Sequence, residues 1–360
     1  MLYPLKFKPV YKQYLWGGTN LRKLGKEIPG GIVAESWEVS CHPDGISIVS
    51  NGEHAGRTLP SLLGEFRQGL VGEELTGRHM EKFPLLVKFI DANERLSVQV
   101  HPDDRYALLH EEGELGKNEI WYVIDAKPGA KLVYGLLPGI TARELEKAAA
   151  ENRLDSCLNY VNVYPGDVLN IPAGLVHAIG EGILIAEIQQ NSNTTYRVYD
   201  YDRVDSKGSK RPLHMDKALD VIDFGSSGRR EKVDGLECAL SNKVSRRVFA
   251  ANQYFALEMY RVIGTVDEYA DGSKFFIYVF IEGEGEIEGP EGTTRFTAGD
   301  TVLIPAALGR YRLSGRFKAL RSYVPDIEKD VVGFLTEYGY GTEEIFRKVA
   351  GLERVAAPVW

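Results

Sequence analysis

The stretch that decides the fold reads Ser97-Val98-Gln99-Val100-His101-Pro102-Asp103-Asp104. Every second side chain of a β-strand points to the same face, so we expect Gln99 and His101 to lie side by side. A single histidine in a strand is usually a packed or solvated one, because short motifs of this kind have weak specificity. The stretch therefore indicates a function only together with two later parts of the chain.

Those two parts supply a carboxylate and a second imidazole. Glu119 opens a β-rich run, and His177 lies just beyond another strand-like run that follows the turn 165–167. Two imidazoles and a carboxylate on neighbouring strands make a three-point metal site with open positions, as in catalytic zinc and non-haem iron sites. The sequence thus predicts a metal site of His101, Glu119 and His177. An amide oxygen of Gln99 would fill a fourth position.

The composition is that of a soluble globular protein. The chain has 360 residues, of which 44% are hydrophobic and 26% charged. Its net charge of −8 argues against non-specific binding to nucleic acid and against adsorption to acidic membranes. No apolar run approaches the ~20 residues of a spanning helix, and the first residues lack the pattern of a signal peptide. An anionic substrate would need a local cationic pocket.

The cysteines indicate a reducing compartment. Cys41, Cys157 and Cys238 are odd in number and far apart, and none belongs to a CxxC pair. This pattern is typical of free thiols rather than of a disulfide framework. We therefore expect a cytoplasmic protein.

Helices are expected to interrupt the β-rich chain. A helix over 58–75 begins with Thr58 as its cap, and its leucines recur at helical spacing. In a second helix, Thr141 and Glu144 form a capping box ahead of an apolar stripe. The helical insertions are expected at about 58–80 and 141–156.

A lysine stands inside an apolar run. Lys88 belongs to the run 85–91, which is bounded by turn-type residues and predicts a buried strand. A lysine there either snorkels to the edge of the sheet or projects into a polar cavity, and the sequence leaves both alternatives open.

The second half of the chain echoes the first. Residues 166–173 read GDVLNIPA, and residues 299–306 read GDTVLIPA. At the position of His177 the second copy carries Arg310, and no histidine follows His214. We interpret this as an internal duplication of a β-barrel unit whose second copy has a structural or oligomerisation role. A further matching pair of runs is 121–125 and 278–282.

We expect three parts in the chain. Residues 1–230 would form a metal-binding catalytic domain with the helical insertions, and residues 231–325 a second domain without a metal site. Residues 326–360 would form a partly helical extension. The boundary is expected at the Gly/Ser/Arg-rich stretch 225–230, which looks like a linker.

Five motifs in order carry a resemblance to a known family. They are Leu-Leu-Val-Lys (85–88), Ser-Val-Gln-Val-His-Pro-Asp-Asp (97–104), Lys-Asn-Glu-Ile-Trp-Tyr (117–122), Pro-Ala-Gly-Leu-Val-His-Ala-Ile (172–179) and Gln-Asn-Ser-Asn-Thr-Thr-Tyr-Arg (190–197). Together they resemble the type I mannose-6-phosphate isomerases, in particular the short bacterial form, over about residues 3–322. The resemblance implies a mainly β protein of two cupin domains, which are jelly-roll β-barrels. It also implies one zinc ion per chain and aldose–ketose isomerisation.

The resemblance also assigns roles to residues. The implied metal ligands are Gln99, His101, Glu119 and His177. Ser97 and Lys117 match the phosphate and substrate contacts of the family, and Arg197 matches its catalytic arginine. Asn193 departs from the pattern, because relatives often carry Asp four residues before that arginine. The tail after about residue 325 also exceeds the short form.

These residues suit the interconversion of mannose 6-phosphate and fructose 6-phosphate through a cis-enediol. A zinc ion with an open position would hold O1 and O2, and Arg197 would help to stabilise the developing negative charge. Lys117 and Ser97 would provide the cationic, hydrogen-bonding contact with the phosphate, and Lys117 and Arg197 are the candidate catalytic side chains. The general base is open between Lys117, a metal-bound hydroxide and another residue.

Other interpretations fit the same residues. Two histidines and a carboxylate also suit Fe(II) in a non-haem oxygenase, and a cupin can bind a sugar without catalysis. Without the resemblance, Lys117 would be read as a solvated loop lysine. Arg197 would be read as the surface partner of Asp200 or Asp202, because exposed ion pairs are common and weak.

Overall fold

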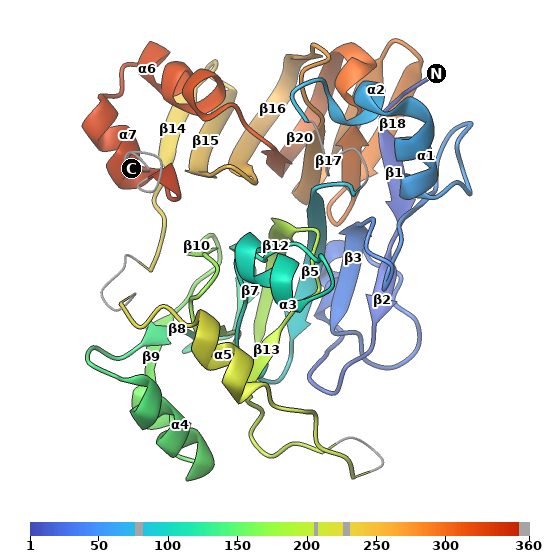
Figure 1. Ribbon diagram of the computed structural model, residues 1–360. Helices are drawn as coiled ribbons and strands as arrows, with labels where there is room; N and C mark the ends of the chain where they lie inside the picture. The colour runs from blue at the N-terminus through green and yellow to red at the C-terminus, as the bar shows by residue number, and fades with distance from the viewer. Residues whose placement is uncertain (76–81, 205–207, 226–230, 353–360) are drawn as a thin grey trace.

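The computed structural model describes residues 1–75, 82–204, 208–225 and 231–352. Most of its regular structure consists of antiparallel β-strands in three sheets, with short helices around them (Figure 1). The mainly β prediction is thereby confirmed. Three expected features lie partly outside the described residues: the linker at 225–230, the end of the first helical insertion and the last part of the C-terminal extension.

The first half of the chain forms two sheets that share a buried apolar cluster. The six-stranded sheet has the order β10 (Val168–Ile171), β7 (Glu119–Ala126), β12 (Ile183–Gln190), β5 (Leu85–Ala92), β3 (Glu35–Val39) and β2 (Val10–Lys12). The five-stranded sheet has the order β13 (Tyr196–Tyr199), β6 (Val98–Val100), β11 (His177–Ala178), β8 (Lys131–Leu136) and β9 (Leu158–Asn162). Trp121 and Ile185 from the first sheet pack in one cluster with Leu132 and Tyr134 from the second, so the two sheets form a sandwich.

The third sheet joins the second half of the chain to its amino end. Its order is β14 (Leu236–Ala239), β15 (Val244–Ala251), β16 (Ala256–Ala270), β20 (Gly309–Tyr323), β17 (Phe276–Gly289), β19 (Thr301–Ile304), β1 (Leu5–Lys8) and β4 (Ile48–Val49), with β18 (Gly292–Thr297) paired to β17. Leu5 of β1 lies opposite Leu303 of β19. The rings of Phe83 and Phe275 also meet, with 4.7 Å between their centroids. Segments from the start of the chain therefore complete the sheet of its second half.

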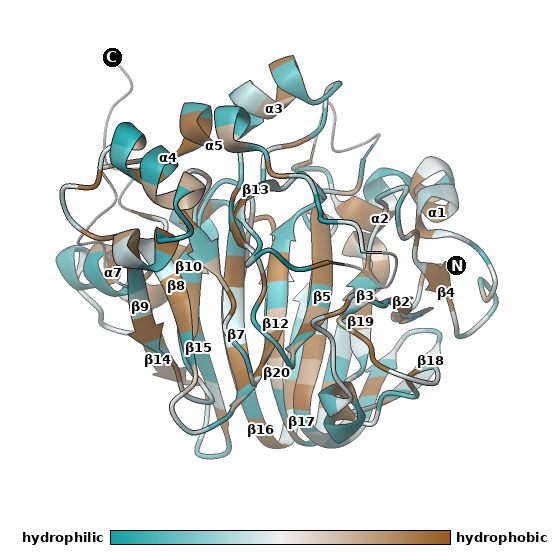
Figure 2. Ribbon diagram, turned by 90° about the horizontal axis from the view of Figure 1, so that it is seen from below, coloured by the Kyte–Doolittle hydropathy of each residue, from teal (hydrophilic) through white to brown (hydrophobic). Residues whose placement is uncertain are grey.

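The helices are short and lie around the sheets (Figure 2). The α-helices are α1 (Leu59–Phe66), α2 (Gln68–Val71), α3 (Asp104–His110), α4 (Ala142–Ala150), α5 (Met215–Val221), α6 (Phe334–Glu337) and α7 (Thr342–Lys348). Single turns of 3₁₀-helix span Asn20–Leu24, Leu154–Cys157 and Ala306–Leu308, and a π-helix spans Ile327–Gly333. Among the described helices, none is both long and apolar enough to cross a membrane.

The expected helix starts are confirmed, whereas the expected helix ends are not. Thr58 caps α1, and Thr141 and Glu144 form the capping box of α4. The helix expected over 58–75 is divided because Arg67 has a positive φ of +44°, which interrupts helical geometry. The helix expected over 141–156 ends at Ala150, and a 3₁₀ turn takes its place further on.

The internal repeat is visible in the strand register. Trp121 lies opposite Leu169 where β7 pairs with β10, and Tyr278 lies opposite Val302 where β17 pairs with β19. These are the equivalent positions of the two copies in the sequence. In addition, β12 lies between β5 and β7 as β20 lies between β16 and β17. The two copies therefore share one strand framework.

The equivalent positions of this framework carry buried ion pairs of opposite polarity. Glu187 of β12 lies opposite both Lys88 and Trp121. Arg321 of β20 lies in the same way opposite both Glu258 and Tyr278. The acid and the base have exchanged strands between the copies.

The pair in the second copy is embedded in a saturated network. The carboxylate of Glu258 is fully buried and accepts hydrogen bonds from Arg321 Nε at 2.9 Å, from the Tyr323 hydroxyl at 2.8 Å and from Arg246. Burial alone would raise the pKa of Glu258, but the charges of Arg246 and Arg321 outweigh it and lower that pKa. This carboxylate is therefore ionised at neutral pH.

Replacing Glu258 by glutamine should destabilise the protein. Within the described chain, Glu258→Gln removes the acidic partner of Arg246 and one of the two acidic partners of Arg321, which keeps only Glu268. Breaking a buried ion pair costs about 3–5 kcal/mol. We expect the free energy of unfolding in urea at pH 7 to fall by about 3 kcal/mol. The matched control is Asp267→Asn, which breaks an exposed pair with Arg312 and should cost less than about 1 kcal/mol.

The same variant should change the response to acid. Because the folded state lowers the pKa of Glu258, this group stabilises the fold at neutral pH and ceases to do so as the pH falls through the folded-state pKa. The wild type should therefore lose more stability between pH 7 and about pH 3 than the glutamine variant does. Equal acid sensitivity of the two proteins, measured by urea unfolding at each pH, would contradict a buried charge at this position.

Candidate metal centre and active site

The strand register places three of the predicted site residues side by side in the five-stranded sheet. His177 of β11 lies opposite Gln99 of β6, and Arg197 of β13 lies opposite Gln99 from the other side. His101 follows β6 directly, and Glu119 is the first residue of β7 in the facing sheet. Residues that are far apart in sequence thus converge inside the sandwich.

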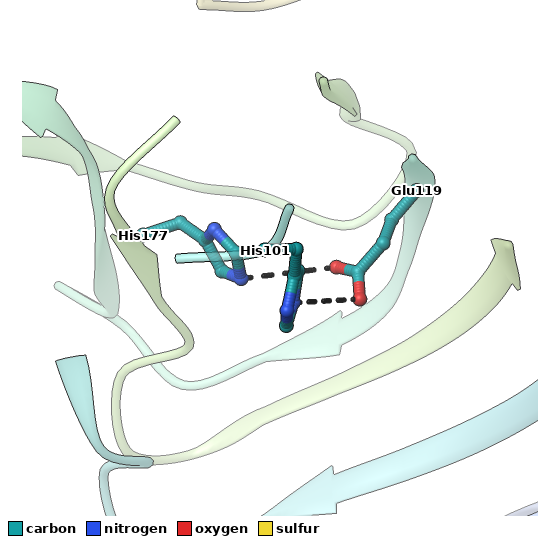
Figure 3. Close-up of side chains that lie close together, drawn as sticks. All are labelled: His101, Glu119 and His177. Carbon is teal, nitrogen blue, oxygen red and sulfur yellow. Dashed lines mark ion pairs between the residues drawn. The ribbon is translucent and has the colours of Figure 1, made fainter. Parts of the chain in front are cut away.

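The two imidazoles and the carboxylate approach one another closely (Figure 3). His101 Nε2 lies 3.1 Å from Glu119 Oε1, and His177 Nε2 lies 3.9 Å from Glu119 Oε2. One ligand atom from each residue lies within 4.8 Å of the others, and all three side chains are buried. Three donors at this spacing can bind a single metal ion.

Backbone carbonyls orient both imidazoles. His101 Nδ1 lies 2.9 Å from the carbonyl oxygen of Thr194, and His177 Nδ1 lies 2.8 Å from that of Leu175. A carbonyl oxygen only accepts, so each Nδ1 donates its proton and each Nε2 keeps a free lone pair. The two lone pairs point toward Glu119. Hydrogen bonds of this kind hold the histidine ligands of metals in the correct tautomer.

The electrostatics suit a cation. Burial and the charge of Lys117 lower the pKa of His101 to about 3, and burial also lowers the pKa of His177. Burial would raise the pKa of Glu119, but the charge of Lys117 together with the interactions of His101 and His177 outweighs burial and holds that pKa well below its usual range. At neutral pH the group consists of two neutral imidazoles and a carboxylate, which is the protonation state that metal binding requires. The donor set therefore fits a divalent metal.

Lys117 and Gln99 complete this group. Lys117 Nζ lies 2.8 Å from Glu119 Oε1 and 3.3 Å from His101 Nε2, and the side chain is buried. The interpretation of Lys117 as a solvated loop lysine is therefore wrong. The side-chain amide of Gln99 lies 3.3 Å from His177 Nε2, within reach of the same point.

A second buried carboxylate lies behind the group and was not predicted as a site residue. The indole N–H of Trp121 lies 3.0 Å from Glu119 Oε2 and 2.8 Å from Glu187 Oε2, so it bridges the two acids. Burial and the charge of Glu119 raise the pKa of Glu187 to about 7. Lys88 Nζ lies 3.3 Å from Glu187 Oε1. Lys88 therefore projects into a polar part of the interior and does not extend to the edge of the sheet. The lysine in an apolar strand was the available sequence signal for this cluster.

Arg197 lies on β13, the strand next to that of Gln99. Its Nη1 donates to the carbonyl oxygen of Pro212 at 2.9 Å, and in the described chain it pairs with neither of the two acids proposed as surface partners. Asp200 instead binds Arg203 and Arg211, and Asp202 binds Lys210.

Ser97 and Asn193 occupy opposite environments. Ser97 is buried just before β6, two residues ahead of Gln99. Asn193 is exposed, and its side-chain amide donates to Asp44 Oδ2 at 2.8 Å. Ser97 is therefore a buried residue next to the strand that carries Gln99, whereas Asn193 lies on the surface.

Two family models match the chain. "Phosphomannose isomerase type I, catalytic domain" matches residues 4–120, and "Mannose-6-phosphate isomerase, cupin domain" matches residues 245–324. The chain is 41% identical to the mannose-6-phosphate isomerase ManA of Bacillus subtilis over 323 residues, which are 89% of this chain and 99% of that relative. It is 36% identical to the mannose-6-phosphate isomerase of Streptococcus mutans over 329 residues, which are 90% of this chain and 99% of that relative.

Solved structures agree with these matches. The crystal structure of the mannose 6-phosphate isomerase from Bacillus subtilis aligns with a TM-score of 0.81 at 36% identity, and covers 89% of this chain and 99% of that one. A crystal structure of a mannose 6-phosphate isomerase with zinc bound aligns with a TM-score of 0.73 over the same shares of the two chains. Its identity is 16%, so this second likeness concerns the fold alone.

The fold and the convergent donor set define a protein of the cupin class with a candidate metal site. At 41% identity over nine tenths of its length, the chain belongs to the type I phosphomannose isomerase family. It is therefore an aldose–ketose isomerase, and neither the oxygenase nor the non-catalytic sugar-binding protein that the same donors allowed.

Removal of one imidazole should abolish metal binding without unfolding the protein. His177→Ala deletes an Nε2 donor, and we expect zinc affinity to fall by more than about 100-fold, because loss of an outer-shell partner alone costs 10–100-fold. Affinity would be measured by competition with a chromogenic chelator, and folding by circular dichroism. The control is His110→Ala, an exposed histidine on α3, which should bind zinc as the wild type does. Stoichiometric, tight zinc in folded His177→Ala would exclude this residue as a ligand.

Proposed function

We propose that the protein interconverts mannose 6-phosphate and fructose 6-phosphate with one Zn²⁺ per chain, through a cis-enediol intermediate. The observation that carries the proposal is the convergence of His101, Glu119 and His177 beside the ammonium group of Lys117. The family and the printed names of its members support the sugar phosphate as substrate.

The proposed zinc ligands are His101, Glu119 and His177, with the amide oxygen of Gln99 as the fourth. A bound Zn²⁺ would supply a Lewis acid that polarises the sugar carbonyl and stabilises negative charge on oxygen. The zinc found in the solved structure of the more distant isomerase supports the choice of metal. Because these ligands all lie within residues 1–230, we propose this part as the catalytic domain and residues 231–325 as a structural one.

Lys117 and Arg197 are the proposed catalytic side chains. A C–H bond beside a carbonyl is a feeble acid until negative charge on the neighbouring oxygen is stabilised. The buried ammonium group of Lys117 lies at the metal ligands, and we propose that it gives a proton to the oxygen on which this charge develops. The permanently charged Arg197, which lies opposite Gln99 on β13, would stabilise the same charge. The buried hydroxyl of Ser97 is proposed as a substrate contact.

The reaction itself can be tested directly. Metal-replete protein supplied with mannose 6-phosphate should form fructose 6-phosphate, measured with a coupled enzyme assay. A chelator should abolish the activity, and Zn²⁺ should restore it equally well with and without oxygen. Absence of product in the metal-replete sample would exclude the proposed function. Turnover in D₂O should also place deuterium on C1 or C2, because the proton leaves carbon in a cis-enediol mechanism.

Lys117→Gln should lower kcat by about 10²–10⁴-fold, the usual contribution of a proton-transferring side chain. The glutamine side chain is similar in shape to part of the lysine side chain, but its amide cannot donate a proton as an ammonium group does. The matched control is Lys127→Gln, which changes an exposed lysine at the end of β7 and should leave kcat unchanged. Zinc content, measured in parallel, separates a catalytic loss from a loss of metal. A kcat within a few-fold of the wild type, with zinc bound, would exclude the catalytic role of Lys117.

A further inference from the structure

The two ends of the substrate need different cationic groups. Isomerisation takes place at C1 and C2, whereas the phosphate is attached to C6 at the other end of the sugar. Lys117, for which the resemblance implied a contact with the phosphate, has its ammonium group at Glu119 and His101 and therefore at the proposed metal ligands. A chain of net charge −8 therefore needs further cations to bind the phosphate.

A pocket with suitable chemistry opens beside Arg197. It has a volume of about 630 Å³, a size typical of small-molecule sites. Its lining includes Tyr14 and Trp16, whose ring centroids lie 5.6 Å apart, and the two arginines Arg203 and Arg211. Aromatic rings pack against sugar faces, and guanidinium groups bind phosphate with two parallel hydrogen bonds.

The pocket adjoins the metal-binding group through β13. Arg197 lies opposite Gln99, which itself lies opposite His177. From there the Arg197 guanidinium reaches the carbonyl oxygen of Pro212, the residue after Arg211. Because Asp200 of the pocket directly follows β13, this strand links the pocket to the strands that carry Gln99 and His177.

The cations of the pocket are held in place and exceed the acids. Asp200 is the only acid among the residues that line the described pocket. This buried carboxylate accepts two hydrogen bonds from Arg211, at 2.6 and 2.7 Å, and further ones from Arg203. One carboxylate thus faces two guanidinium groups, with Arg197 as a third nearby. Within the described residues the buried Nε of Arg197 has no hydrogen-bond partner, and burial together with the charge of Arg211 lowers the pKa of Arg197. An anion in the pocket would relieve this excess of positive charge.

We propose that Arg203 and Arg211 bind the phosphate group of the substrate in this pocket, with the sugar directed past Arg197 toward the metal site. This inference rests on the proposed function, because it names the part of the chain that binds one end of the proposed substrate. Arg203 and Arg211 act here as specificity-determining residues for phosphorylated sugars.

The test is a split between KM and kcat. Arg211→Gln should raise KM for mannose 6-phosphate by about 10- to 100-fold, the effect of losing hydrogen bonds to a charged group, with kcat within about 3-fold of the wild type. Arg211→Lys keeps the charge but loses the paired hydrogen bonds, so it should have an intermediate KM. The matched control is Arg312→Gln, which removes an exposed arginine in the second half of the chain and should leave KM unchanged. An unchanged KM in Arg211→Gln would overturn the inference.

A binding measurement distinguishes failure of this inference from failure of the proposed function. Inorganic phosphate is the probe, and its affinity for the wild type and for Arg211→Gln is measured by calorimetry on zinc-loaded protein. We expect phosphate to bind the wild type and to bind the variant at least about 10-fold more weakly. Equal affinity would overturn the inference even in an active enzyme. If the wild type formed no fructose 6-phosphate, the proposed function would fail, and weaker phosphate binding by the variant would still support an anion site in the pocket. Circular dichroism and zinc content confirm that each variant is folded.

Discussion

A carboxylate such as that of Glu119, placed in an apolar sandwich, loses several kcal/mol of hydration that charges and hydrogen bonds must replace. Lys117 supplies the opposite charge, and the indole of Trp121 supplies a hydrogen bond. The strands that carry these groups are kept in register by the apolar cluster between the two sheets. His101 and His177 are fixed in turn by backbone carbonyls of neighbouring segments. The donor group thus exists only as long as the sandwich holds its strands together, which is why its members need not be close in sequence.

The two copies of the strand framework each bury an acid–base pair at the same positions, but the two pairs have different surroundings. Lys88 and Glu187 occupy the positions that Glu258 and Arg321 occupy in the second copy. The attraction within an ion pair does not depend on which strand carries which sign, so the framework tolerates the exchange. In the second copy, a tyrosine and a further arginine saturate the carboxylate, and the pair is a structural element. In the first copy, Glu187 shares a tryptophan N–H with the carboxylate of the metal group, so the pair is coupled to the site.

Local sequence patterns predicted the structural features that depend on neighbouring residues. They did not predict the features that depend on residues far apart in the chain. Alternation along a strand was sufficient to expect Gln99 and His101 on one face, and the repeated motif predicted the register that the two copies share. Pairing of β1 with β19 joins segments from opposite ends of the chain, and no local pattern encodes such a partner. The helix break at Arg67 depends on a backbone angle that arginine rarely adopts. The burial of Lys117 was accessible only through the resemblance, because the exposure of a loop residue is decided by what packs around it.

Arg197 connects the two ends of the proposed substrate site. Its strand neighbour Gln99 faces the metal group, while its guanidinium contacts the backbone next to Arg211. A buried carboxylate already holds the guanidinium groups of the pocket in place, so binding a phosphate there would cost little side-chain entropy. The phosphate takes no part in the bond changes, so its contacts are the same in the ground state and in the transition state, and their loss is expected to raise KM rather than to lower kcat. Because the chain as a whole repels anions, this attraction is local, and it favours a substrate whose charged end reaches the pocket while its carbonyl end reaches the metal group.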